Sequence, residues 1–457
     1  MNSLIVAVVI LIALSFAYRW GVSTSRKVAN APGVEMHSRF GYHGLLVALW
    51  CAIPAAITFV IYLIFEPMIA DWVIASHIPA DIAADRGETA AAISRIRGIA
   101  TGFGAVGDIP PYQQAAANAL ARVHAIAWYA VIALAAAAGA LGAAVARSRI
   151  TPDLRARNRV EVAIKVLLVT CSAIAILTTV GIVLSVLSEA IRFFTFVNPI
   201  DFLLGTNWNP RFSSTGSGSQ GDFGLLPLLW GTVMITIIAM LVAVPVGLMS
   251  AIYLSEYAGP KFRLIAKPAL EILAGIPTIV YGIFAIFTVG PFFASVGNAI
   301  GLQIQATSAF TAGVVMGIMI IPFVSSLSDD IISQVPKAMR DGSYGLGATQ
   351  SETIRKVILP AALPGVVGAF LLAVSRAIGE TMIVVLAAGN SPVLTANPFE
   401  AVSTVTVTIV NQLTGDTDFA SPQSLVAFAL GLTLFLITLC LNVVAIVIVK
   451  KYREQYE

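Results

Sequence analysis

Arg376 and Glu380 are charged residues inside a strongly apolar stretch of the chain, residues 361–386. If this stretch is a membrane helix, Arg376 lies about 15 residues from its start, roughly 22 Å at 1.5 Å per residue. An arginine at that depth costs at least about 2.5–3.5 kcal/mol, so it should face a partner or a polar pathway. Glu380 follows four residues later, on the same face of a continuous helix.

Two interpretations of these charges are open. They can form a buried ion pair that only fixes helix packing, or Arg376 can line a path for an anion while Glu380 holds it and partly neutralises it. The planar donors of a guanidinium match two oxygens of an oxyanion at once. We therefore expect Arg376 and Glu380 to belong to a substrate pathway.

Other candidate residues give weaker indications. Cys51, Cys171 and Cys440 are scattered through apolar runs, which suits buried thiols better than a disulfide framework or a metal cluster. Residues 102–107 read G-x-G-x-x-G, but a helix-like stretch precedes them and two prolines follow, so we interpret them as a flexible turn rather than a dinucleotide site. No His, Cys or carboxylate cluster points to catalysis, and we expect no enzyme, metal or cofactor.

The composition indicates that water is not the main surroundings of the chain. Of 457 residues, 58% are hydrophobic and only 11% are charged, against about 25% charged in ordinary soluble domains. This excludes a soluble enzyme, a disordered chain and a nucleic-acid binder. The formal net charge of +3 is too small to identify a partner.

Nine apolar runs are long enough to cross a bilayer as helices, which predicts an all-α integral membrane protein. They are residues 2–18, 44–65, 123–146, 166–187, 225–254, 273–290, 308–327, 361–386 and 425–449. The first resembles the apolar part of a signal peptide, but its basic cluster follows the run, so we interpret it as a retained helix.

The basic residues predict the orientation of these spans. Of the 27 lysines and arginines, 20 fall in one set of alternate loops and six in the other. Basic loops stay in the cytoplasm, so we expect an N-terminus outside and a C-terminus inside the inner membrane. Composition shifts near residue 150, where a basic stretch separates an N-terminal extension with three spans (1–150) from a second domain with six (151–457).

One predicted cytosolic loop, residues 328–360, contains several residues that start helices or turn the chain. Pro336 and Asp341 are helix-start signals, Gly345 and Gly347 can turn the chain, and Ser351 can begin a second short helix. The sequence therefore predicts two short helices with a sharp bend, a shape that suits insertion into a partner's groove. The chain contains no Walker-type nucleotide motif, so any ATP must be bound by another subunit.

This loop resembles the EAA loop of ABC-importer permeases. The shared features are an acidic residue, two small residues, a glycine six positions after the acid and a Leu-Pro ending. They fall on Asp341, Gly342, Ser343, Gly347, Leu359 and Pro360. Asp replaces the usual Glu and Gly-Ser replaces Ala-Ala, so the first turn should be less helical, by up to about 1 kcal/mol for the glycine.

Further motifs are similar to the PstC-type permeases of phosphate ABC importers. They are FGLLP at residues 223–227, SEYA at 255–258, LAGIPTIVYG at 273–282, SRAIGETM at 375–382 and GN at 389–390. The resemblance runs from about residue 166 to the C-terminus. It implies that the last six spans form a type I importer core of the MetI-like kind.

The resemblance also implies a function and partners. The chain is expected to be a non-catalytic permease for inorganic phosphate, paired with a homologous PstA-like permease and two cytosolic ATP-binding subunits. An extracytoplasmic binding protein would deliver the phosphate. Two alternatives remain open at this point: a permease for another oxyanion such as sulfate or molybdate, and an ion-coupled secondary transporter that works without ATPases.

Overall fold

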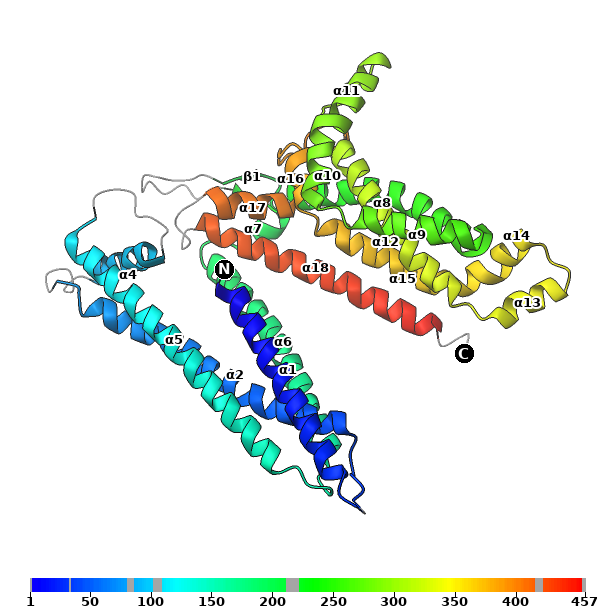
Figure 1. Cartoon of the computed structure of the whole chain (residues 1–457). Coiled ribbons are helices and arrows are strands. Elements are labelled where there is room, and N and C mark those ends of the chain that lie inside the picture. Colours follow the sequence, from blue (N-terminus) through cyan, green and yellow to red (C-terminus); the bar gives the residue numbers. More distant parts are fainter. Residues whose placement is uncertain are drawn as a thin grey trace. The chain divides into compact units, whose positions relative to one another are not determined.

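The computed structural model describes residues 2–32, 34–79, 86–101, 109–210, 222–415 and 422–453, and these residues are almost entirely helical (Figure 1). The predicted all-α membrane fold is confirmed. The strands among the described residues are β1 (Trp208–Asn209) and β2 (Asp222–Phe223), which pair antiparallel. The G-x-G-x-x-G turn at residues 102–107 lies outside the described residues.

The chain divides into two compact units, Met1–Leu177 and Thr178–Glu457. The division falls inside α6 (Ala156–Phe193), a long helix that contributes to both units. The predicted boundary at residue 150 falls in the short link that precedes this helix.

In the first unit, α2 (Phe40–Ala75) packs against α1 (Asn2–Ala29) and α5 (Pro111–Ser148), and α4 (Arg86–Thr101) packs on α5. Near the C-terminal end of α5, Arg147 lies 4.4 Å from the ring centroid of Trp20 and Arg149 lies 5.7 Å from that of Trp50. Arginines stacked on tryptophans are typical of the border between apolar and polar surroundings, where the ring is amphipathic and the cation is partly hydrated.

Eight described helices are long and apolar enough to cross a membrane. They correspond to eight of the nine predicted spans. The other prediction, residues 2–18, lies in α1, where the structure does not describe the side chains of residues 2–9.

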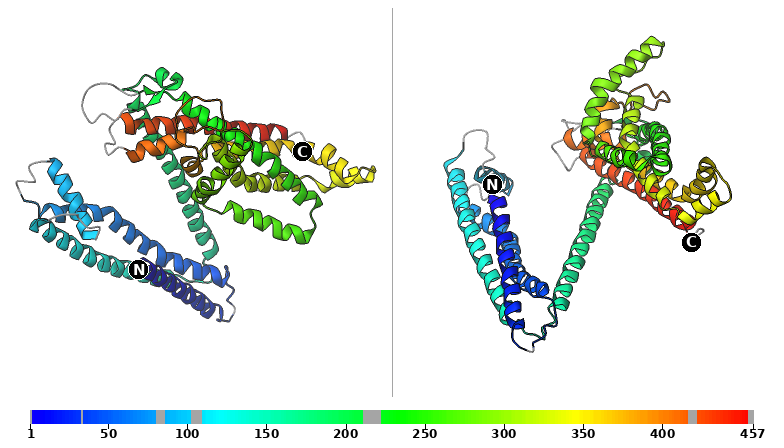
Figure 2. Two further views of the ribbon diagram at one scale, coloured as in Figure 1. Left: turned by 90° about the horizontal axis from the view of Figure 1, so that it is seen from above. Right: turned by 45° about the vertical axis from the view of Figure 1, so that its right-hand side comes forward.

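In the second unit, α8 (Leu226–Ile252), α12 (Ala309–Ser333), α15 (Leu359–Ile378) and α18 (Pro422–Arg453) pack side by side in this order (Figure 2). α12 is the central helix, because 61% of the residues in its most apolar part are buried, against 6% in α18. The core here combines small residues with larger ones, such as Ala239 on α8, Met316 and Ile320 on α12 and Ala373 on α15. Small side chains let membrane helices approach closely, which fixes the position of α12.

The remaining elements of this unit are short. They are α7 (Pro199–Leu204), η1 (Tyr253–Tyr257), α9 (Pro260–Ala274), α10 (Thr278–Phe284), η2 (Ala285–Val289), α11 (Gly290–Ala299), α13 (Lys337–Gly345), α14 (Gln350–Thr353), η3 (Ile354–Ile358), α16 (Met382–Ala387) and α17 (Val405–Gly415). The η segments are π-helical turns.

Two predicted spans are wrong in position. The span predicted at residues 273–290 is broken near its start, because Pro277 is extended (φ −56°, ψ 137°) and separates α9 from the continuous helix Thr278–Ala299. The span predicted at residues 361–386 lies on a continuous helix, Gln350–Ile378, which ends eight residues before the predicted end. Proline cannot donate the backbone hydrogen bond that would continue α9, and glycine at position 379 is a poor helix former.

The stretch between the last two predicted spans, residues 387–424, contains helix α17, which the sequence did not predict. Thr404, Thr406, Thr408 and Gln412 are buried on or beside it, and Thr406 Oγ1 donates to the backbone oxygen of Glu380 at 2.9 Å. Alternating threonines and valines are typical of strands rather than helices, which concealed this element. The helix packs on α18 and α8, so it belongs to the body of the unit rather than to a free loop.

Candidate functional site

The loop predicted to be cytosolic forms two short helices, α13 and α14, that project from one end of the second unit (yellow in Figure 2). The predicted bend and the helix start after Pro336 are confirmed. The expectation that Asp341 begins a helix is wrong, because Asp341 lies in the middle of α13, and the helix continues through Gly342.

The bend between the helices depends on Gly347. Its φ of +85° is a left-handed conformation that costs other L-residues roughly 1–2 kcal/mol. Two residues later Thr349 caps α14: its Oγ1 accepts from the backbone N–H of Glu352, and the Glu352 carboxylate accepts from the backbone N–H of Thr349 at 3.0 Å. The turn is therefore specified by local sequence.

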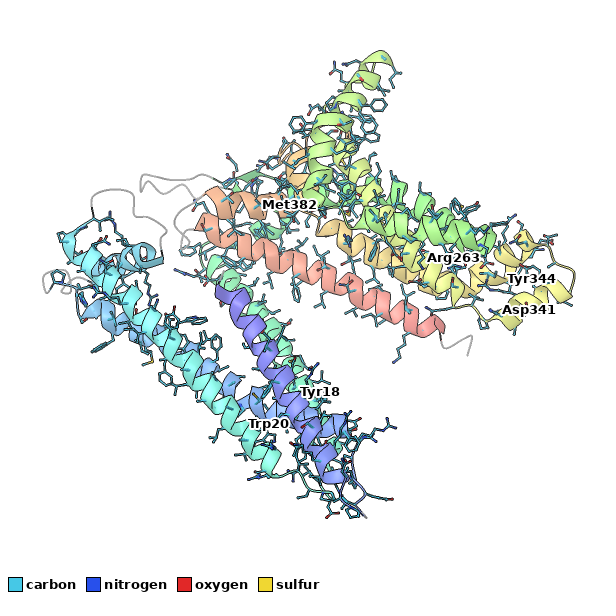
Figure 3. The ribbon with its side chains drawn as sticks, in the orientation of Figure 1. Tyr18, Trp20, Arg263, Asp341, Tyr344 and Met382 are labelled. Carbon is cyan, nitrogen blue, oxygen red and sulfur yellow. The ribbon has the colours of Figure 1, made fainter. Side chains whose placement is uncertain are left out.

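The outer end of this element presents apolar surface next to a carboxylate. Leu346 is 91% exposed and Tyr344 is 43% exposed, and Figure 3 shows Tyr344 and Asp341 at the tip. Neighbouring exposed apolar side chains at the end of a helical hairpin can form a contact surface. We refer to residues 337–353 as the coupling loop.

Glu256 holds the coupling loop in place. Its carboxylate accepts from Arg340 at 2.7 Å, and its backbone oxygen accepts from the Gln350 side chain at 2.6 Å. Arg340 also donates to the backbone oxygen of Ile332 at 2.7 Å. The Glu256 side chain is 5% exposed and that of Arg340 is 19% exposed, so this is a largely buried ion pair. It joins η1, the turn that follows α8, to α13 across 84 residues, a separation that the sequence does not reveal.

The six residues predicted for ATPase coupling lie in one segment but have different surroundings. Asp341, Gly342 and Gly347 are exposed, whereas the Ser343 hydroxyl lies 2.9 Å from that of Thr353 and joins the two short helices. Leu359 and Pro360 begin α15, and Leu359 packs on the buried cluster that contains Ile332 and Ile358. Movement of the coupling loop would therefore be transmitted directly to a membrane helix.

Arg376 and Glu380 are not paired on one helical face. α15 ends at Ile378, and Glu380 lies in the break before α16, where its carboxylate accepts from the backbone N–H of Met382 at 3.1 Å. It thus satisfies a donor at the start of α16 that has no helical partner. Arg376 lies in the last turn of α15, where Nη2 is 3.8 Å from the sulfur of Met319 and the guanidinium is 5.4 Å from the ring centroid of Phe323. Among the described residues Arg376 forms no ion pair, so the predicted neutralisation by Glu380 is wrong.

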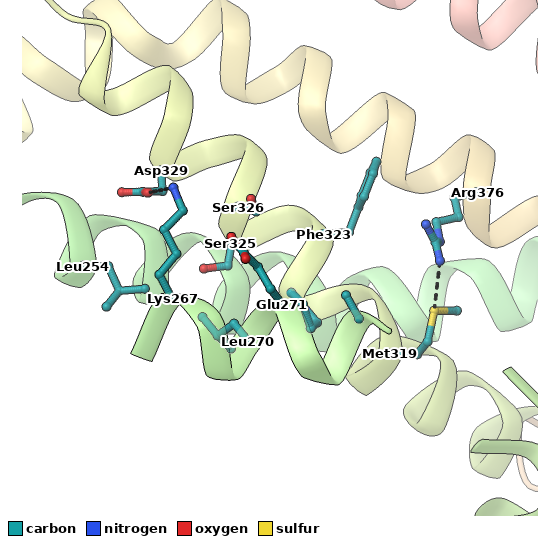
Figure 4. A pocket seen from close by; sticks show the side chains of 12 residues that line it. Leu254, Lys267, Leu270, Glu271, Met319, Phe323, Ser325, Ser326, Asp329 and Arg376 are labelled. Carbon is teal, nitrogen blue, oxygen red and sulfur yellow. Dashed lines mark hydrogen bonds and ion pairs between the residues drawn. The ribbon is translucent and has the colours of Figure 1, made fainter. Parts of the chain in front are cut away.

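A cavity of about 230 Å³ opens beside Arg376 (Figure 4). In this view Ser325, Ser326 and Glu271 lie between Lys267 on one side and Arg376 on the other. The polar residues come from α9, α12 and α15, and the rest of the lining is mainly apolar. Of these residues, only Arg376 was predicted from the sequence as part of a site.

A cluster of charges closes one side of this cavity. Asp329 is 1% exposed, and its carboxylate accepts from Arg263 at 2.9 Å and from Lys267 at 2.8 Å. Lys267 also contacts Asp330 at 3.1 Å. The hydrogen bond to Asp329 is the main cause that holds the pKa of Lys267 above its usual value, so its ammonium stays charged. These contacts tie α9 to the central helix α12.

Comparisons with known proteins identify the family. Residues 243–454 match the family described as "Binding-protein-dependent transport system inner membrane component", and residues 6–178 match one described as "Phosphate ATP-binding cassette transporter". The "Probable ABC transporter permease protein YqgH" of Bacillus subtilis is 33% identical over 292 residues, which cover 64% of this chain and 91% of that protein. The chain belongs to the binding-protein-dependent transport permeases.

Other relatives of the permease are named for their substrate. The "Phosphate transport system permease protein PstC" of Mesorhizobium japonicum is 33% identical and covers 60% of this chain and 86% of its own length. The protein of the same name from Haemophilus influenzae is 34% identical, with coverages of 55% and 82%. A solved structure of the MetNI methionine ABC transporter covers 49% of the permease and 93% of its own chain at 19% identity, with a TM-score of 0.37.

Within the part of the permease that the structure describes, no group of three or more His, Cys, Asp or Glu side chains can hold a metal ion. At the cavity, the guanidinium of Arg376 and the hydroxyls of Ser325 and Ser326 are groups that can donate hydrogen bonds to an anion.

Proposed function

We propose that this permease is the PstC-type subunit of an ATP-driven importer of inorganic phosphate. The observation that carries the proposal is its 33% identity to a phosphate transport system permease over 86% of that protein's length. The coupling loop supports ATP-driven transport, since a secondary transporter has no need of a rigid apolar tip held by a buried ion pair. The permease itself is non-catalytic in this proposal, and ATP is hydrolysed on a separate subunit.

The proposal includes three kinds of partner. The coupling loop docks on one of two cytosolic ATP-binding subunits, and an extracytoplasmic binding protein delivers phosphate. A homologous PstA-like permease completes the path. Helix α9 supports a second permease, because none of its residues is buried within this chain although Leu264, Ile265 and Ile272 are large and apolar. Closure of the ATPases would move the coupling loop and rock α15, so that access alternates.

Arg376 and Glu380 retain separate roles in the proposed path. Arg376 presents its guanidinium at the cavity without a carboxylate partner among the described residues, so its donors are available to an oxyanion. Glu380 lies just before α16, and its carboxylate accepts from the first backbone N–H of that helix, which supports the break in the chain next to Arg376. Breaks of this kind in transporters expose backbone groups beside the substrate path.

Phosphate uptake tests the proposed function. In bacteria that lack their own phosphate permease, we expect this chain with its partner subunits to restore uptake of radioactive phosphate, and the uptake should require ATP. Sulfate and molybdate uptake should remain at the level of the empty host. Uptake of sulfate or molybdate instead of phosphate would show that the proposed substrate is wrong. Uptake driven by an ion gradient without the ATPases would show that the chain is a secondary transporter.

The orientation of the spans is a separate proposal, based on the 20-to-6 division of basic residues. Gln350, in the coupling loop, is placed in the cytosol, and Ala396, an exposed residue before α17, is placed outside. In a variant without native cysteines, Ala396→Cys should react with an impermeant maleimide in intact cells. Gln350→Cys should react only after the cells are opened. The reverse pattern would invert the whole topology.

A further inference from the structure

The cavity beside Arg376 contains a buried hydroxyl with no partner. Ser325 is 1% exposed, lines the cavity, and its Oγ has no hydrogen-bond partner among the described residues. A buried polar group left unsatisfied costs about 1–3 kcal/mol. Ser326 lines the same space. These hydroxyls can donate to an anion inside the cavity.

Glu271 supplies a hydrogen-bond acceptor to the same cavity. It lies one helical turn after Lys267 on α9, lines the cavity and forms no ion pair among the described residues. Because a carboxylate only accepts hydrogen bonds, it would repel a fully deprotonated anion placed next to it. It can instead accept a hydrogen bond from an anion that carries a proton.

We propose that this cavity is a transit site for a protonated tetrahedral oxyanion and that Glu271 selects the protonated form. Arg376 and the serine hydroxyls donate to the bare oxygens, while Glu271 accepts from the remaining O–H. Phosphate keeps at least one proton at neutral pH, whereas sulfate keeps none. A site built to pair with a ligand's O–H rejects the analogue that lacks it, because the site's own polar group is then left unpaired.

The charge balance suits transit rather than storage. Around the cavity the three basic side chains Arg263, Lys267 and Arg376 accompany three acidic ones, Asp329, Asp330 and Glu271, so no large excess of positive charge traps an anion. Conduction requires a site that binds well enough to admit the substrate and weakly enough to release it. The inference rests on the proposed phosphate transport and adds the cavity residues that distinguish phosphate from other anions.

Protection of an introduced cysteine tests the site. The full transporter is prepared with Cys51, Cys171 and Cys440 replaced by alanine, and either Ser326→Cys or Ala274→Cys is added, since both positions line the cavity. The rate of reaction with a methanethiosulfonate reagent is then measured with inorganic phosphate, arsenate or sulfate. At a phosphate concentration ten times the dissociation constant for the cavity, labelling should be about tenfold slower, because its rate follows the fraction of empty sites. Arsenate should act likewise, and the same concentration of sulfate should have little effect.

The selecting role of Glu271 is tested in the same assay. Glu271→Gln, which can donate as well as accept, should let sulfate slow labelling about as strongly as phosphate does. Glu161→Gln, an exposed acidic residue of the first unit, is the matched control and should leave the preference for phosphate unchanged. Ala396→Cys, away from the cavity, should react at a rate that no anion alters.

The outcomes separate this inference from the proposed function. If the cysteine-free transporter takes up phosphate but phosphate does not protect either cavity cysteine, the transit site is wrong and the function stands. If sulfate protects the unaltered site as well as phosphate does, Glu271 is not the selecting residue. Absence of phosphate uptake in the parent transporter would remove the proposed function and this inference with it.

Discussion

Replacing Glu256 by alanine should abolish ATP-driven uptake while the permease still reaches the membrane. The substitution removes the carboxylate that pairs with Arg340 at 2.7 Å, although the backbone oxygen that holds Gln350 remains. Leaving one member of a buried ion pair without its partner costs about 3–5 kcal/mol. The helices of the coupling loop have nine and four residues and are too short to be stable alone, so the loss should disorder the loop. Uptake, membrane level and co-purification of the ATPase are measured together.

Two controls isolate the ion pair. Glu256→Ala combined with Arg340→Ala removes the uncompensated charge and should recover part of the ATPase association. Glu161→Ala removes an ion pair on the surface, in which the Glu161 side chain is 51% exposed and that of Arg157 is 63% exposed. Exposed ion pairs contribute at most about 1 kcal/mol to stability, so uptake should not change. Normal uptake and normal ATPase association in Glu256→Ala would show that the coupling loop does not need this anchor.

Much of the fold was predictable because it depends on local patterns. Length and hydropathy located eight helices that the structure confirms as long and apolar enough to span a membrane. The helix-start signal at Pro336 and the turn signal at Gly347 predicted the bent coupling loop. These features are encoded within about 20 consecutive residues.

The missed features depend on distant residues or on competing local signals. The apolar run continues past Gly379, so hydropathy alone could not place the end of α15, and the carboxylate of Glu380 serves the next helix instead of Arg376. Glu256 and Arg340 are far apart in the chain, as are Lys267 and Asp329, and only the packing of α9 and α13 brings them together. For the same reason the cavity residues Glu271 and Ser325 were not selected from the sequence.

Replacing Arg376 by glutamine should reduce phosphate uptake on the order of 100-fold, since truncating a charge-assisted contact of this kind costs about 2–5 kcal/mol. Arg376→Lys keeps the charge but loses the planar fork, so it should restore only part of the activity. Membrane level should stay normal, because Arg376 forms no ion pair among the described residues and no buried carboxylate is left without its cation. Uptake is measured per molecule of assembled transporter, with ATPase association as a check on coupling.

Glu380→Gln distinguishes a path arginine from a packing pair. The glutamine oxygen can still accept from the N–H of Met382, so α16 should still begin at the same place and uptake should stay close to that of the parent. The double variant Arg376→Gln with Glu380→Gln should therefore behave like Arg376→Gln alone. A packing pair predicts the opposite, namely low abundance in each single variant and recovery in the double. Near-normal uptake by Arg376→Gln in a fully assembled transporter would remove this arginine from the substrate path and leave its contacts with Met319 and Phe323 as its only function.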